Sequence, residues 1–226
     1  MIILHGDNIV ASREKLTSHL SNLKEQGKKV VRFDAKPLSR AELESALGES
    51  DLFGTQKGIV IEALHSLPTS ARKKELLSLL EQETPHEVIL WEKRALTPTM
   101  LKKFPQAQAS EFKTSNALFA WLDLFGSQGN PQKKLSLLHE AILKDGEYLC
   151  FLMLVRHIRL LLLAKTGGTI KGPPFMVSKY KKQAHNFTET QLIHLHTKLV
   201  ELDEKAKTSR LALPLQSQLD LFTLGV

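Results

Sequence analysis

Cysteine is nearly absent from this 226-residue chain, because Cys150 is the only one. A disulfide framework is therefore excluded. Cys150 lies in the apolar run Tyr148–Val155, so we expect it to be a core residue of a protein that works in a reducing compartment. The spacing of metal ligands is missing as well. The closest two histidines, His194 and His196, are two positions apart on an expected helix, where their side chains point in different directions.

Uninterrupted apolar segments are also short. The longest, Glu147–Lys165, carries Arg156, His157 and Arg159 in its middle, which predicts a buried bundle helix rather than a membrane span. The apolar run at the amino terminus is too short for a signal peptide, and no basic residue precedes it. We therefore expect a cytoplasmic protein with no membrane partner. The net charge of +7 favours polyanions as neighbours without specifying one.

Apolar runs alternate with helical patterns in the first half of the chain. We expect strands at 1–5, 29–34, 58–63 and 87–91, an edge-like strand at 108–112, and helices at 9–26, 39–47, 68–83 and 97–104. This alternation predicts an α/β fold with a doubly wound parallel sheet.

The pattern changes near residues 113–116, after which no strand is expected. Helices fit the ranges 116–126, 131–144, 147–165, 174–185, 188–207 and 213–224. The sequence therefore predicts two domains, an α/β domain over 1–114 and an all-helical domain over 115–226.

The turn Gly6-Asp7-Asn8, between a strand and a helix, stands where a P-loop protein holds its nucleotide. A phosphate cradle needs several glycines, a Gly-Lys pair and a Ser or Thr for Mg²⁺. Here there is one glycine, Asp7 would repel phosphate, and Lys15 is too far along the helix. The fourth strand ends at Glu92 without the paired acids that would hold a metal. We expect no catalytic residue, no metal and no cofactor, which argues against a degenerate nucleotide-binding enzyme.

The stretch Gly48–Glu62 begins as a polar turn and ends as a buried strand. Between the two it carries Leu52 and Phe53, with glycines at positions 48 and 54, so neither a long helix nor a regular strand fits the pair. Two interpretations are open. Leu52 and Phe53 either pack under the domain as a core plug or anchor a partner outside it.

A series of segments, in this order, resembles the delta subunit of the bacterial DNA polymerase III clamp loader. They are ILHGDN, VVRFDA, SDLFGTQKGIVIE and EVILWEK, followed by NALFAWLDLFGSQGNPQKKLSLL, VRHIRLLLLAK, GPPFMVSKYKKQAHNFTETQL and LDEKAKTSR. The order and spacing carry the resemblance, since no single segment is specific. The family has an AAA+-like domain without a working P-loop, a small helical lid and a helical collar. Here helix 116–126, which resembles the start of the collar, follows the α/β domain almost directly. The resemblance therefore implies a short form without the lid, either a minimal delta subunit or a delta-like paralogue with a narrower role.

The resemblance implies a non-catalytic subunit of the DNA polymerase III holoenzyme that binds the ring-shaped sliding clamp and helps to open it. Leu52 and Phe53 would enter an apolar pocket on the clamp (beta). The collar-type domain would join the chain to ATPase subunits of the gamma/tau and delta prime types. Contact with DNA would be indirect or non-specific.

A second candidate for clamp binding lies near the carboxyl terminus. Its residues match the short clamp-binding peptide QL[SD]LF: Gln218, Leu219, Asp220, Leu221 and Phe222. Docking through this peptide alone would make the protein a stand-alone clamp-binding adaptor. The alternative is that Leu215, Leu219 and Phe222 form the apolar face of the last collar helix.

Two further features of the chain are formed by charged residues. A basic run could face DNA in an assembled loader or could be a solvated helix face: Lys171, Lys179, Lys181 and Lys182. Asp203 and Lys207 are four positions apart, which predicts a local ion pair on a helix.

Overall fold

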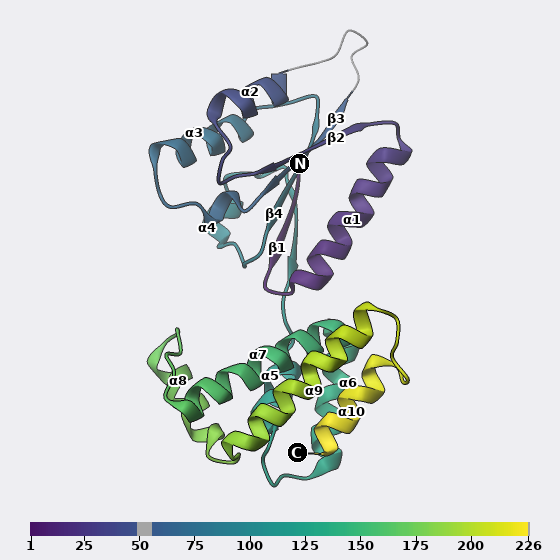
Figure 1. The fold of residues 1–226 in the computed structure, drawn as a ribbon. Coiled ribbons are helices and arrows are strands. Elements are labelled where there is room, and N and C mark those ends of the chain that lie inside the picture. Colours follow the sequence, from purple (N-terminus) through teal and green to yellow (C-terminus); the bar gives the residue numbers. More distant parts are fainter. Residues whose placement is uncertain (49–55, 226) are drawn as a thin grey trace. The chain divides into compact units, whose positions relative to one another are not determined.

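The computed structural model describes residues 1–48 and 56–225 (Figure 1). Leu52 and Phe53 lie outside the described residues. The chain divides into two compact units, Met1–Thr114 and Ser115–Val226. The first contains the α/β pattern and the second is helical, and each is described by itself.

The first unit is built on a five-stranded parallel sheet with the order β2-β3-β4-β1-β5. The strands are β1 (Ile2–Gly6), β2 (Lys29–Asp34), β3 (Lys57–Glu62), β4 (Glu87–Glu92) and β5 (Gln108–Phe112). Strands β1, β3 and β4 lie in the centre and are almost fully buried, as expected where helices cover both faces of a parallel sheet. The predicted doubly wound α/β fold is confirmed.

Alternate residues of the central strands point to opposite faces and form two separate cores. Helix α1 (Ile9–Glu25) covers one face, where Leu16 and Leu23 pack with side chains that include Leu4 and Val60. The other face is covered by α2 (Arg40–Gly48), α3 (Ala71–Leu80) and the short α4 (Pro98–Leu101), and its core includes Ile3, Ile59, Leu43 and Leu76. Figure 1 shows α1 on one side of the strands and the other three helices on the opposite side.

Caps set the helix ends. The backbone N–H of Ser39 donates to Glu42 Oε2 at 2.8 Å, and that of Glu42 donates to Ser39 Oγ at 3.2 Å, so the predicted capping box is present. The helix predicted over 68–83 is too long at both ends, because α3 spans only Ala71–Leu80. It begins after Ser70, whose hydroxyl accepts a hydrogen bond from the N–H of Lys73. A 3₁₀ turn, η1 (Leu64–Ser66), precedes it.

The second unit is all-helical, as predicted. Its helices are α5 (Asn116–Leu124), α6 (Pro131–Asp145), α7 (Glu147–Thr166), α8 (Pro174–Ala184), α9 (Glu189–Lys207) and α10 (Leu215–Leu224). Helix α7 is the centre of this unit and packs against each of the others. Cys150 on α7 is fully buried, as predicted, and burial raises the pKa of its thiol to about 12. No helix among the described residues is long and apolar enough to span a membrane.

An aromatic cluster closes the turn after α5. Phe125 is buried and stacks on Phe187, with the ring centroids 6.3 Å apart. Gly126 follows with a φ of +73°, and a Cβ at this position would lie 1.9 Å from Cζ of Phe187. Glycine is therefore required here for its backbone conformation and also for the space it leaves to the Phe187 ring.

We expect Gly126→Ala to lower the free energy of unfolding by about 2–4 kcal/mol, because it adds displacement of Phe187 to the strain of a left-handed alanine. Gly167→Ala is the matched control, since Gly167 has a φ of +76° in the same unit and no atom within 4 Å of an added Cβ. The control should lose only about 1 kcal/mol. Urea unfolding of both variants measures the difference, and equal losses would contradict the steric explanation.

Candidate partner-binding site

The carboxyl edge of the sheet is where an α/β protein would bind phosphate, and here the turn after β1 is closed by β5. Gly6 has a φ of +138°, and a Cβ on it would lie 2.0 Å from the carbonyl oxygen of Phe112. The backbone of β5 therefore lies directly against the turn. Only glycine permits this approach.

Hydrogen bonds within the protein engage several polar groups of this turn. The N–H of Gly6 donates to the carbonyl of Arg94 at 3.1 Å, and that of Asn8 donates to the carbonyl of Phe112 at 3.0 Å. Asp7 Oδ1 accepts from the N–H of Thr114 at 2.8 Å. The side chain of Asn8 accepts from Ala11 and caps α1. These groups hold β1, β5 and α1 together and do not form an anion cradle.

The acid at the end of β3 is engaged by two arginines. Arg13 donates to both carboxylate oxygens of Glu62, at 2.9 and 2.6 Å, and Arg32 adds a contact of 2.6 Å. The hydrogen bonds from Arg13 are the main reason that the pKa of Glu62 is lowered. The guanidinium of Arg13 also lies over the Trp91 ring, 3.5 Å from its centroid. Arg13 therefore fastens α1 to the sheet.

A second polar cluster surrounds Glu92, at the end of β4. Glu92 is fully buried and accepts from the N–H of His65 at 2.6 Å, and burial raises its pKa. Lys73 and Arg94 both donate to the carbonyl of His65, and Lys73 also donates to that of Leu67 at 2.7 Å. Burial, reinforced by these cations, lowers the pKa of His65 to about 4. The cluster holds η1 against the sheet, which gives Glu92 and the side chains around it a structural role.

The predicted contact residues Leu52 and Phe53 belong to the connection between α2 and β3. Helix α2 ends at Gly48, and β3 begins at Lys57 at the amino edge of the sheet, opposite the closed turn at Gly6. The structure does not describe the pair itself. Its role as a clamp contact stays a prediction.

The amino edge of the sheet carries a groove of about 420 Å³. Its lining includes Met1 before β1, Val88 in β4, the segment 80–84 and the segment 103–107. Thr84 in this lining donates to the carbonyl of Leu47, near the end of α2, at 3.3 Å. The groove therefore adjoins the helix from which the predicted contact segment departs, and this edge is the candidate partner-binding site of the first unit.

The QLDLF residues belong to helix α10. Leu219 is fully buried, and Thr223 accepts a hydrogen bond from the indole N–H of the buried Trp121 at 3.1 Å. Asp220 Oδ1 lies 2.8 Å from Nε2 of His139. Gln218 and Phe222 line a groove, and Leu221 is 56% exposed. In this helix Leu219 is part of the core, so the segment is not presented as an extended peptide.

The basic residues differ in their surroundings. Lys179 Nζ lies 2.6 Å from Asp123 Oδ1, so this lysine is part of an ion pair between α8 and α5. Lys171, Lys181 and Lys182 are exposed, the last two in the final turn of α8, where cations interact favourably with the helix dipole. Their contact with DNA stays a prediction.

Other predicted polar features fall within the helical unit. The ion pair of Asp203 and Lys207 is present, with Nζ and Oδ2 2.5 Å apart. His157 on α7 is buried beside Tyr180, and burial lowers its pKa to about 4. In the part of the chain that the structure describes, no group of three or more His, Cys, Asp or Glu residues is arranged to hold a metal.

Comparisons with known proteins give a likeness of fold only. No protein-family model matches the chain, and no curated protein matches it. Among solved structures it is similar to the Bacillus subtilis DNA clamp loader delta protein (YqeN), with a TM-score of 0.47 and 14% sequence identity. The match covers 99% of this chain and 94% of the other. A likeness at this level of identity and TM-score does not determine function.

Several of the residues that organise the carboxyl edge are not apparent from the sequence. Arg13 and Glu62 are far apart in the chain and meet only when α1 packs across the sheet. Glu92 gives a weak signal, because an acid that ends a buried strand needs a partner. Its partners, His65 and Ser66, come from the connection after a different strand.

We expect Leu219→Ala to lower the free energy of unfolding by about 2–4 kcal/mol, because it removes a fully buried side chain where α10 packs on α6 and α7. Leu221→Ala, two positions along and exposed, is the control and should change it by less than about 0.5 kcal/mol. Denaturant unfolding followed by circular dichroism measures both. A neutral Leu219→Ala would mean that α10 leaves the bundle readily and acts as a tail.

Proposed function

We propose that this chain is a non-catalytic, clamp-loader delta-like subunit that binds a sliding clamp and helps to hold it open for loading onto primed DNA. The order of resembling segments in both halves of the sequence supports this proposal. So does the pairing in one chain of a parallel α/β unit with an all-helical unit.

The observation that carries the proposal is the closed turn after β1. In a sheet of this type the carboxyl edge is the usual place for a nucleotide. Here the N–H groups of Gly6 and Asn8 donate to carbonyls of the protein, and the backbone of Phe112 in β5 lies directly against Gly6. Such a unit is suited to binding a protein partner and not to nucleotide chemistry.

The proposed clamp contact is made by Leu52 and Phe53. Burial of two large apolar side chains in a pocket is worth roughly 3–6 kcal/mol before the cost of ordering the segment. Such a contact is strong enough to be a binding hot spot. If it is better made to the open ring than to the closed ring, it shifts the clamp toward the open state without ATP.

The remaining partners follow from the same proposal. The helical unit would join the chain to ATPase subunits of the gamma/tau and delta prime types, within the cytoplasmic replication machinery. DNA would be contacted indirectly or non-specifically, with the exposed Lys171, Lys181 and Lys182 as the candidate side chains. The short form without a lid would attach the clamp-binding unit directly to the collar.

The stand-alone adaptor is the weaker alternative. In α10 the side chain of Leu219 is fully buried, so presenting the whole QLDLF segment as a peptide would require α10 to leave the bundle. We therefore prefer the loader subunit.

The test is the affinity of Phe53→Ala for a purified sliding clamp. We expect it to bind at least about tenfold more weakly than the unchanged chain, a loss of at least ~1–2 kcal/mol, with the same melting temperature. Surface plasmon resonance and thermal unfolding measure the two quantities.

The control is Phe175→Ala, which removes a phenylalanine that is 73% exposed in the helical unit and should leave clamp affinity unchanged. If Phe53→Ala instead unfolds the protein and its refolded fraction binds the clamp normally, Phe53 is a core plug. The proposed contact is then wrong.

A further inference from the structure

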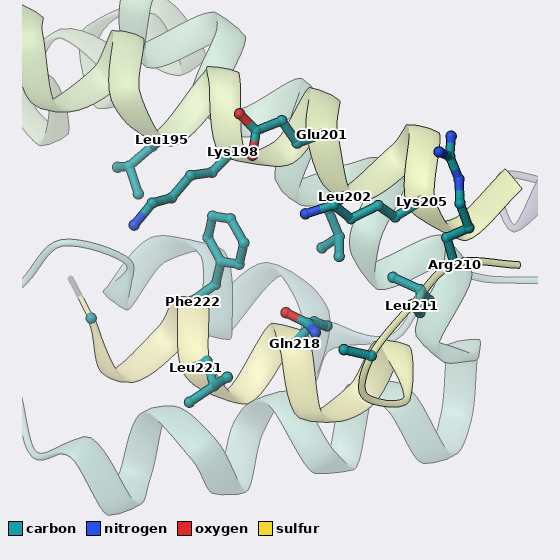
Figure 2. A pocket seen from close by; sticks show the side chains of 12 residues that line it. Leu195, Lys198, Glu201, Leu202, Lys205, Arg210, Leu211, Gln218, Leu221 and Phe222 are labelled. Atoms are coloured by element: carbon teal, nitrogen blue, oxygen red, sulfur yellow. The ribbon is translucent and has the colours of Figure 1, made fainter. Parts of the chain in front are cut away.

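The helical unit contains a groove between α9 and α10 that the proposed clamp contact does not use (Figure 2). It has a volume of about 390 Å³. Apolar side chains come from both helices and from the segment between them: Leu195, Leu202, Leu211, Leu221 and Phe222. Figure 2 shows Phe222 pointing from α10 toward α9, with open space beside it.

Cations outnumber anions along this groove. The charged residues of the lining are Lys198, Lys205, Arg210 and Glu201. Arg210 already donates to Glu204 at 3.0 Å. Lys198 and Lys205, in contrast, form no ion pair with any residue that the structure describes. Two unpaired positive charges therefore stand beside apolar surface.

The spacing of these lysines defines what fits the groove. Lys198 and Lys205 are two helical turns apart on α9, about 10 Å along its axis. Leu221, which belongs to the lining, is 56% exposed, so apolar surface of the groove is left uncovered. A helix laid along the groove would meet apolar surface along its centre and two cations that are two turns apart.

We propose that this groove binds an acidic amphipathic helix of a partner protein. Leu or Phe side chains of that helix occupy the space beside Phe222, and carboxylates two turns apart pair with Lys198 and Lys205. The inference goes beyond the proposed function. It does not depend on clamp binding, because the groove lies wholly within the helical unit.

The test uses two synthetic peptides of about 18 residues, long enough to form a helix with a good N-cap. Both have Leu and Phe along one face. One has Glu flanking that face at positions two turns apart, and the other has Lys at the same positions. We expect the acidic peptide to bind at least about tenfold more tightly by fluorescence anisotropy at physiological ionic strength. The double variant Lys198→Glu/Lys205→Glu should reverse the preference, which loss of fold alone would not do.

The double variant Lys181→Glu/Lys182→Glu is the matched control, because it makes the same charge change on exposed lysines of α8 and should keep the preference for the acidic peptide. Equal binding of the two peptides, no binding of either, or the same loss in the α8 variant would overturn the proposal. Sedimentation of the unchanged chain tests a second occupant. Self-association that Leu221→Glu abolishes would assign the groove to a second copy of the chain and also overturn it.

Discussion

The close packing of β5 against the turn after β1 is the contact on which the first unit depends. It requires the backbone of Gly6, and it uses the N–H groups of Gly6 and Asn8 in bonds to the protein itself. The rest of the carboxyl edge is arranged in the same way. Arg13 and Arg32 neutralise Glu62, and Glu92 holds η1. The edge that commonly binds a ligand in this fold is therefore occupied by contacts within the protein.

The helical unit is organised around α7, and α10 packs on both α6 and α7. Because every other helix of the unit packs on α7, the last helix contributes its buried side, with Leu219, to the core. Its other side stays open beside α9. The match to a clamp-binding peptide and the position in the last helix of the bundle therefore concern the same residues. Burial of Leu219 favours the helix.

Local sequence patterns predict the fold well, because hydrophobic periodicity distinguishes buried strands from amphipathic helices and shows that the two alternate. They predicted the absence of a phosphate cradle for a similar reason, since the cradle needs glycines within a few positions. Local patterns do not predict contacts between residues that are far apart in the sequence. Two such contacts are the pair of hydrogen bonds from Arg13 to Glu62 and the bond from the N–H of His65 in η1 to Glu92. Both depend on the strand order, which hydrophobic periodicity does not specify. Leu52 and Phe53 are proposed from the sequence alone, and their contact with a sliding clamp remains a proposal.

The central claim is that the first unit binds a sliding clamp without nucleotide chemistry. The most direct measurement is the dissociation constant of this chain for a purified clamp, determined with and without saturating ATP and Mg²⁺. The closed turn at Gly6 predicts binding in both conditions, with constants that agree within about twofold. Binding that requires ATP, or a large change of affinity on adding it, would contradict the account.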